Sequence, residues 1–138
     1  MKTIGVIRED KANRITEIGE PVGVVLGIIP STNPTSTVIY NAMIALKSRN
    51  TIVFSPHPAA LKCTSEAARL MAEAAETAGA PAHTIECITH PSMAATNELM
   101  HSEEVKMIIA TGGSAMVKAA YSCGKPALWV GPGNGPSY

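Results

Sequence analysis

Four short polar turns contain the residues of this sequence best suited to chemistry. They are Ser31–Pro34, Ser55–Pro58, His90–Ser92 and Thr111–Ser114. Each follows an apolar run and precedes a stretch with helical periodicity. The first turn of a helix has unpaired N–H groups and the positive end of the helix dipole, and both favour anions. The four turns therefore predict a site for a phosphate-bearing ligand.

The glycine turn Thr111-Gly112-Gly113-Ser114 is the most distinctive of them. Two adjacent glycines let the backbone approach an anion closely, and Thr111 or Ser114 can donate a hydroxyl. No Gly-Lys-Ser/Thr follows, so it is not a P-loop, and it does not match G-x-G-x-x-G. A turn that serves only packing is the alternative.

Two further side chains each have a functional and a structural interpretation. Asn33 can cap the helix that begins at Pro34, or its amide can donate to an oxyanion. His57 lies between two prolines, where it can contact a ribose or phosphate or simply be solvated. Cys63, Cys87 and Cys123 are far apart and show no metal-ligand spacing, so we expect no metal site and three reduced, mostly buried thiols.

The turns must be held by alternating strands and helices. Residues 22–29 are a near-continuous apolar run, typical of a strand covered on both faces. Further strands are expected at 51–54, 84–88, 105–110 and 127–130, and helices at 34–47, 59–77, 93–100 and from about 114 to 121. This βαβαβαβαβ order predicts an α/β fold, a Rossmann-like parallel sheet in a three-layer αβα arrangement. All four turns then lie at one edge of the sheet, where such folds bind ligands.

Residues 1–20 form a separate unit before that domain. Two short β-prone runs, 3–8 and 14–18, flank the polar residues 9–13, which is a hairpin signal. An isolated two-stranded ribbon is marginal in water, so we expect this β-hairpin arm to add to another sheet or subunit and to support a homo-oligomer. Residues 21–138 are expected to be the nucleotide-binding domain.

Composition narrows the partners of this 138-residue chain. Eleven basic and eleven acidic residues cancel and form no basic stripe, so nucleic acid is not an expected partner. The longest apolar run is too short for a bilayer span, and no signal-type segment follows Met1. We therefore expect no membrane partner and a cytoplasmic location.

Five segments spread over nearly the whole chain are distinctive when taken together: PVGVVLGIIPSTNPTST, FSPHP, EAARLMAEAAETAGAP, ATGGSAMVKAAYSCGKPA and VGPGNGP. In sequence and in order they resemble one known family, the CoA-acylating aldehyde dehydrogenases. Family members oxidise an aldehyde with NAD or NADP through a cysteine thiohemiacetal and pass the acyl group to CoA. The resemblance thus implies NAD (or NADP) as the coenzyme and CoA as a co-substrate.

The resemblance also implies roles for particular residues. Asn33 corresponds to the family's oxyanion asparagine, with an alignment that shifts by one residue against ordinary family members. The implied cofactor-binding residues are Ile29, Pro30, Ser31 and Thr32 on the nicotinamide side, Ser55, His57 and Pro58 near the adenine ribose, and Thr111, Gly112, Gly113 and Ser114 in the glycine turn.

The C-terminal segment has two features that bear on the resemblance, one on the acyl acceptor and one on the catalytic cysteine. The stretch from Trp129 to Asn134 lacks the glutamate that activates water in hydrolytic relatives, which agrees with CoA as the acyl acceptor. The family's catalytic cysteine belongs downstream of Tyr138, so we expect a fragment, truncated before the catalytic domain and inactive alone. A non-catalytic nucleotide-binding or self-assembly module is the main alternative, and a phosphate-binding α/β regulator is the other.

Overall fold

The body of the protein is a five-stranded parallel sheet. The computed structural model describes residues 2–112 and 114–130, apart from the side chains of residues 114, 115, 117, 129 and 130. In the order in which they hydrogen-bond, the strands are β5 (Ile85–Cys87), β4 (Thr51–Pro56), β3 (Val24–Ile29), β6 (Val105–Thr111) and β7 (Ala127–Val130). All four pairings are parallel, as the alternation of elements predicts.

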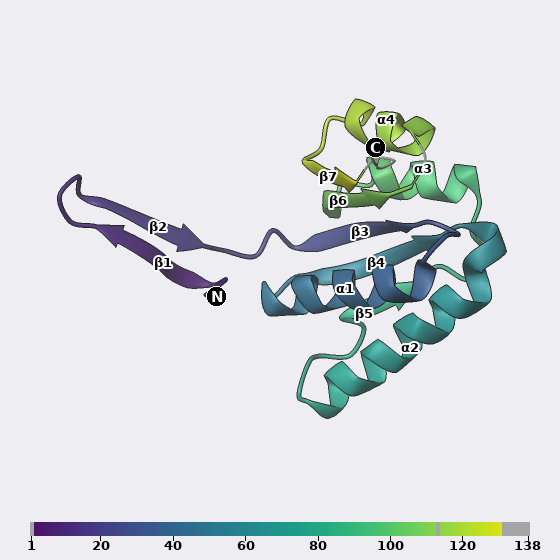
Figure 1. Ribbon diagram of the computed structural model, residues 1–138, viewed down its shortest axis with the longest axis horizontal. Coiled ribbons are helices and arrows are strands. Elements are labelled where there is room, and N and C mark those ends of the chain that lie inside the picture. The colour runs from purple at the N-terminus through teal and green to yellow at the C-terminus, as the bar shows by residue number, and fades with distance from the viewer. Residues whose placement is uncertain (1, 113, 131–138) are drawn as a thin grey trace, which may run out of the picture.

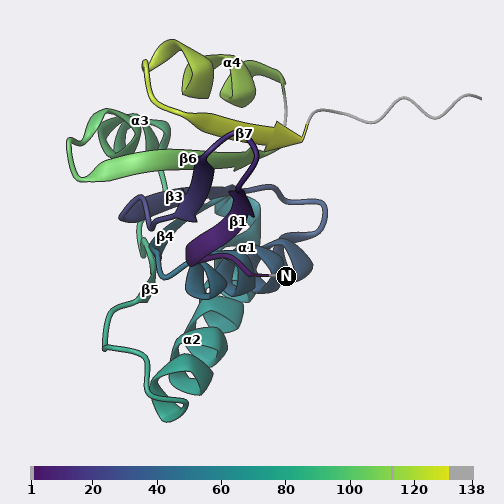
Figure 2. The same cartoon turned by 90° about the vertical axis from the view of Figure 1, so that its left-hand side faces the viewer.

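Helices cover the two faces of this sheet. Helices α1 (Pro34–Lys47) and α2 (Leu61–Thr77) lie on one side, and α3 (Met93–His101) and α4 (Ser114–Ser122) lie on the other (Figure 1, Figure 2). Each layer has its own apolar core, one built around Val38 and Phe54 and the other around Met100 and Ile108. This confirms the three-layer αβα arrangement and the Rossmann-like fold class.

Strand β3 belongs to both cores because its side chains alternate. Val25 and Ile29 point into the core under α1 and α2, whereas Leu26 and Ile28 point into the core under α3 and α4. A strand buried on both faces needs apolar residues at every position, which is why this run does not alternate with polar residues.

The predicted element boundaries hold to within a few residues, with two corrections. Strand β4 does not end at Phe54: Ser55 and Pro56 continue the parallel ladder opposite Ile28 and Ile29. A serine can be buried at this position of the strand because its hydroxyl is hydrogen-bonded to that of Thr96. The helix expected from residue 59 begins instead as the short 3₁₀ turn η1 (Pro58–Ala60) and becomes α-helical at Leu61.

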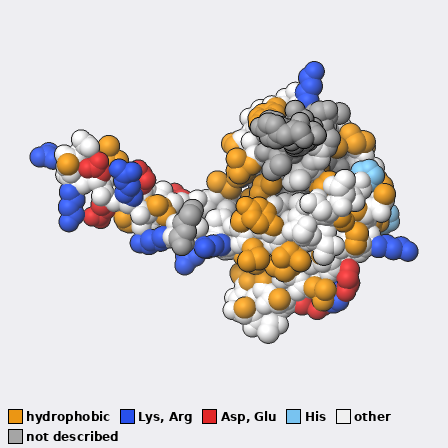
Figure 3. Space-filling model, viewed as in Figure 1, with side chains coloured by type: hydrophobic (Ala, Val, Ile, Leu, Met, Phe, Trp, Pro, Cys, Tyr) orange, Lys and Arg blue, Asp and Glu red, His pale blue; other side chains and the backbone are white. Residues whose placement is uncertain are grey.

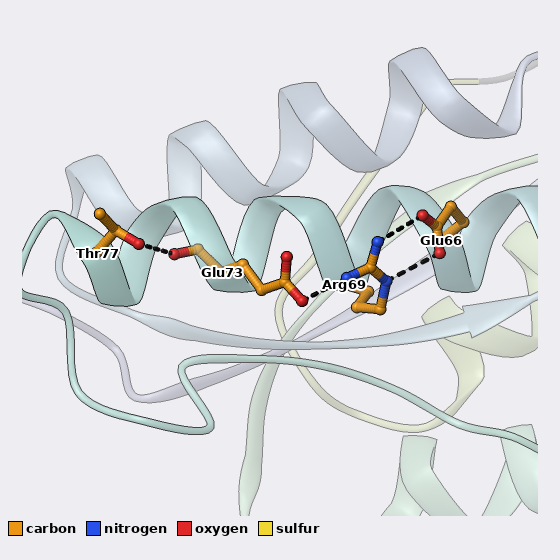
Figure 4. A network of polar contacts seen from close by, with 4 residues as sticks. All are labelled: Glu66, Arg69, Glu73 and Thr77. Atoms are coloured by element: carbon orange, nitrogen blue, oxygen red, sulfur yellow. Dashed lines mark hydrogen bonds and ion pairs between the residues drawn. The ribbon is translucent and has the colours of Figure 1, made fainter.

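The outer face of α2 is polar. Arg69 donates to Glu66 at 2.6 and 2.9 Å and also pairs with Glu73, while the Thr77 hydroxyl donates to the carbonyl of Glu73 (Figure 4). The hydrogen bond from Arg69 holds the pKa of the Glu66 carboxyl below its usual range. This network marks the solvent side of α2 and contributes little to stability, because its groups are exposed.

The N-terminal hairpin stands apart from the body. Strands β1 (Gly5–Asp10) and β2 (Ile15–Gly19) pair with each other and form a sheet of their own. The hairpin projects as an arm on which charged side chains of both signs are concentrated (Figure 1, Figure 3). At its base, the Asn50 side-chain oxygen accepts from the backbone N–H groups of Val22 and Gly23 at 2.7 and 2.9 Å.

A substitution at Gly27, in the centre of the sheet, would test how closely the core is packed. A Cβ added at Gly27 would lie 2.8 Å from Cδ1 of Phe54, which is fully buried. We expect Gly27→Ala to lower the free energy of unfolding by about 1–3 kcal/mol, as overpacking does. Urea unfolding measures this. In a Phe54→Leu background the added cost should shrink, because the clashing ring is gone. An equal cost in both backgrounds would contradict this account.

Candidate functional site

The strand order places a topological switch point between β3 and β6. From β3 the chain passes through α1 to β4 on one side, and later returns through α3 to β6 on the other side of β3. The helices that follow β3 and β6 are α1 and α4, which lie on opposite faces of the sheet, so the connections diverge beyond the carboxyl ends of these two strands. In doubly wound sheets this divergence opens the crevice in which ligands bind.

A cavity of about 300 Å³ lies at this edge, and we call it the strand-end cavity. Its walls come from the ends of β3, β4 and β6 and from the first turns of η1, α3 and α4. The lining residues are Ile28, Ile29, Pro30, Ser55, Pro56, His57, Pro58, Ser92, Met93, Thr96, Thr111, Gly112 and Met116. Apolar walls with a few polar groups are typical of small-molecule sites.

The polar groups of the cavity are joined by hydrogen bonds. The hydroxyls of Ser55 and Thr96 lie 2.7 Å apart, and Thr96 Oγ1 donates to the Ser92 carbonyl oxygen at 2.9 Å. Ser92 also caps α3, since its Oγ accepts from the backbone N–H of Ala95 at 3.0 Å. Ser55 is 2% exposed and Thr96 is 5% exposed, so this network is held inside the protein.

The glycine turn closes the cavity on the β6 side. Gly112 has φ +153°, which L side chains rarely adopt, and a Cβ there would sit 3.9 Å from Cβ of Pro30. The backbone at Gly112 thus faces the turn after β3 with no side chain between them, as close approach to a ligand requires. Gly113 lies outside the described residues, as does the side chain of Ser114.

A second hollow, of about 320 Å³, lies on the α1 side of the same strand ends. We call it the α1 hollow; its lining residues are Asn33, Ser36, Thr37, Tyr40, Asn41, Ile109 and Thr111. Thr111 borders both spaces. Asn41 is 2% exposed, and its side-chain nitrogen has no hydrogen-bond partner within the described part of the chain.

Asn33 stands at the N-cap position of α1, but its side chain does not cap the helix. Pro34 has no N–H, and Asn33 Oδ1 instead lies 3.4 Å from the hydroxyls of Thr32 and Thr37. The backbone carbonyl of Asn33 accepts from Thr37 Oγ1 at 2.8 Å. The capping interpretation of its side chain is therefore wrong, and the amide stands at the rim of the α1 hollow.

The strand-end cavity brings together many of the predicted cofactor-binding residues but not all of them. Ile29, Pro30, Ser55, His57, Pro58, Thr111 and Gly112 line it. Ser31 and Thr32 are exposed on the turn and line neither space. Exposure of His57 agrees with its position between prolines, and its Nδ1 accepts from the Ala59 N–H at 3.1 Å.

Sequence reasoning missed several lining residues. Ser92 lies in the turn 90–92, which the sequence places at this edge of the sheet, so it could have been predicted to line the site. Thr96 and Met116 come from helices, and no local pattern indicates which helical side chains face a cavity. The same holds for Thr37 and Asn41 in the α1 hollow.

The thiols differ from the expectation in their burial. All three cysteines are free, but Cys63 is exposed and the other two are only half-buried. Within the described residues, no group of three or more His, Cys, Asp or Glu side chains is arranged to hold a metal ion. None of the described helices is long and apolar enough to cross a membrane.

Comparison with known proteins gives consistent matches over this chain. The model of the aldehyde dehydrogenase family matches residues 2–128. An aldehyde-alcohol dehydrogenase of Streptococcus pneumoniae serotype 4 is 59% identical over 137 residues, which are 99% of this chain and 16% of that protein.

Two solved structures show the same fold. An acetylating aldehyde dehydrogenase from Geobacillus thermoglucosidasius superposes with a TM-score of 0.92 at 68% identity, over 96% of this chain and 29% of that one. A Rhodopseudomonas palustris propionaldehyde dehydrogenase with bound propionyl-CoA gives 0.80 at 41% identity, over 83% and 25% of the two chains. This chain therefore spans less than a third of each of these three proteins.

The two N-cap positions at this edge give a matched pair of stability predictions. Ser92→Ala removes a capping hydrogen bond to Ala95 and should lower the free energy of unfolding by about 1 kcal/mol. Asn33→Ala removes no capping bond and should change it by less than about 0.5 kcal/mol. Chemical denaturation of both variants measures the two changes in the free energy of unfolding. Equal losses would contradict the finding that the Asn33 side chain does not cap α1.

Proposed function

This chain belongs to the aldehyde dehydrogenase family, and we propose that it is the coenzyme-binding part of a CoA-acylating member. Such an enzyme oxidises an aldehyde with NAD or NADP and transfers the acyl group to CoA. The observation that carries the proposal is the strand-end cavity, which lies at the switch point and gathers seven of the residues expected to bind the coenzyme.

The residues of the cavity suit the adenosine end of a dinucleotide. Its apolar walls, which include Ile28 and Met116, can pack against a flat base. The hydroxyl oxygen of Ser55 can accept a hydrogen bond from a sugar. Gly112 lies two residues before α4, and the first turn of a helix is where backbone N–H groups can bind a pyrophosphate. A volume near 300 Å³ fits such a part and not a whole dinucleotide.

The α1 hollow suits the reacting end. Asn33 stands on the turn between β3 and α1 with an amide that is not used as a helix cap. In the complete enzyme, this amide would donate to the oxygen that becomes negative when a thiol adds to the aldehyde. The coenzyme side and the reaction side would then meet at the end of β3.

The three cysteines are not suited to be that thiol. The Cys63 and Cys123 thiols donate to the carbonyl oxygens of Ala60 and Ala120, three residues earlier in the chain, and neither cysteine lines the α1 hollow beside Asn33. Burial raises the pKa of the Cys87 thiol and disfavours the thiolate. We therefore expect this chain alone to bind coenzyme and to form no acyl-CoA, and thioester formation by the pure chain would contradict that division.

Calorimetric titration with NAD⁺ and NADH tests the proposal directly. We expect weak binding, with a dissociation constant of about 1 mM, because a small open site holds only part of the ligand. Absence of heat and of chemical-shift changes at several millimolar ligand would overturn it.

Two glycines that flank α4 provide a matched pair for that titration. Gly112→Leu places a side chain beside Pro30 in the cavity and should abolish measurable NAD⁺ binding. Gly124→Leu also places a side chain at a positive φ (+76°), but nothing lies within 4 Å of its Cβ, so binding should persist. Equal losses of binding in both variants would show that strain, and not filling of the cavity, causes the effect.

The hairpin arm supports a second proposal, that two copies of the chain associate through it. Among the described residues its strands pair only with each other, and the arm exposes Ile15 and Ile18 at 54% and 60%. A two-stranded ribbon with free edges and exposed aliphatic side chains gains stability by adding to another sheet.

Sedimentation equilibrium tests this self-association. The double substitution Ile15→Thr/Ile18→Thr keeps β-branched side chains but removes apolar contact, and it should weaken association at least about tenfold. Leu70→Thr, at a comparably exposed site on α2, is the control and should leave association unchanged. A wild-type chain that stays monomeric at high concentration would refute the proposal.

A further inference from the structure

We propose that Thr96 is a positioning residue that makes the Ser55 hydroxyl a hydrogen-bond acceptor toward the strand-end cavity. The cavity then takes an unphosphorylated ribose and discriminates against a ribose 2′-phosphate. This rests on the proposed coenzyme-binding function and adds to it a direction of hydrogen bonding and a choice between NAD and NADP.

The direction follows from counting protons. A threonine hydroxyl has one proton, and Thr96 donates its proton to the Ser92 carbonyl oxygen at 2.9 Å. The contact of 2.7 Å between Ser55 and Thr96 must then be made by the Ser55 proton. With that proton used, the Ser55 oxygen has only lone pairs left for a ligand, and it can accept but not donate.

The position of Ser55 in the fold indicates which ligand group its oxygen would accept a hydrogen bond from. Strands β3 and β4 with α1 between them form the first βαβ unit of the sheet, and Ser55 lies near the carboxyl end of β4. In dinucleotide-binding folds of this topology, a carboxylate about 20 residues after the first turn accepts from the ribose 2′-hydroxyl. Ser55 offers the same acceptor without the charge.

The remaining lining residues do not favour a phosphate. The described residues around the cavity include no lysine or arginine. His57 is the only titratable group among them, and its Nδ1 already accepts from the Ala59 N–H at 3.1 Å. A dianionic 2′-phosphate would leave water to meet apolar walls and the lone pairs of Ser55.

The first turn of α3 is the competing feature, since a helix N-terminus attracts anions. One of the amides that the helix leaves unpaired is already used, because the Ala95 N–H donates to the Ser92 side chain at 3.0 Å; the Thr96 N–H makes the first helical bond, to the Ser92 carbonyl. Ser92 therefore saturates part of that turn and supports the acceptor arrangement at Ser55 as well.

Paired titrations of the 138-residue chain with NAD⁺ and NADP⁺ test the inference. We expect the wild type to favour NAD⁺ at least about tenfold, and Thr96→Val to bring the two affinities within about threefold, because Ser55 regains a proton to donate. Thr96→Ser keeps the relay and should keep the preference. Ser55→Ala should weaken NAD⁺ several-fold and leave NADP⁺ unchanged.

The ratio of the two affinities separates positioning from structural damage, because a misfolded fraction lowers both titration amplitudes alike. Equal wild-type affinities would overturn the inference and leave the proposed function standing. A preference that survives Thr96→Val would overturn the role of Thr96. Binding of neither nucleotide would overturn the proposed function together with the inference.

Discussion

The structure depends on one strand, β3, that must be covered on both faces and hydrogen-bonded along both edges. Leu26 and Ile29 are almost completely buried in different cores, and β4 and β6 flank the strand in parallel register. Because both faces are covered, two helical layers are required: α1 follows β3 on one face, and α4 follows the neighbouring strand β6 on the other. The switch point, and the crevice beyond it, follow from that burial.

The same burial explains why two spaces lie at one strand end. The strand-end cavity opens on the α3 and α4 face and the α1 hollow opens on the other, with Thr111 bordering both. In the proposed function, coenzyme and acyl chemistry approach the end of β3 from opposite faces of the sheet. In the same proposal Asn33 stands on the reaction side, with a side chain that does not cap α1.

The order of elements could be predicted from sequence because each carries a local signal. Each of three local patterns predicts the element that contains or follows it: the apolar run from Val24 to Ile29, Pro34 at the start of α1, and the glycine turn at Gly112. The burial of Ser55 could not be predicted from such local patterns. It looks like a turn residue, yet it is a buried strand residue, since a partner on α3, Thr96, satisfies its hydroxyl from 41 positions away. The lining of the cavity by Thr96 and Met116 depends on how helices pack, which local pattern does not encode.

The pairing of β3 with β6 also orders events in folding. Val24 and Val105 are neighbours in the sheet, although α1, β4, α2, β5 and α3 lie between them in the chain. The hairpin and the β3–α1–β4 unit can form from nearby segments, whereas the β3–β6 contact must close a long loop before it gains any stabilisation. The cavity has walls on both strands, so it exists only after that closure. During synthesis, the strand-end cavity is thus completed after the arm and the α1 side of the sheet can already have formed.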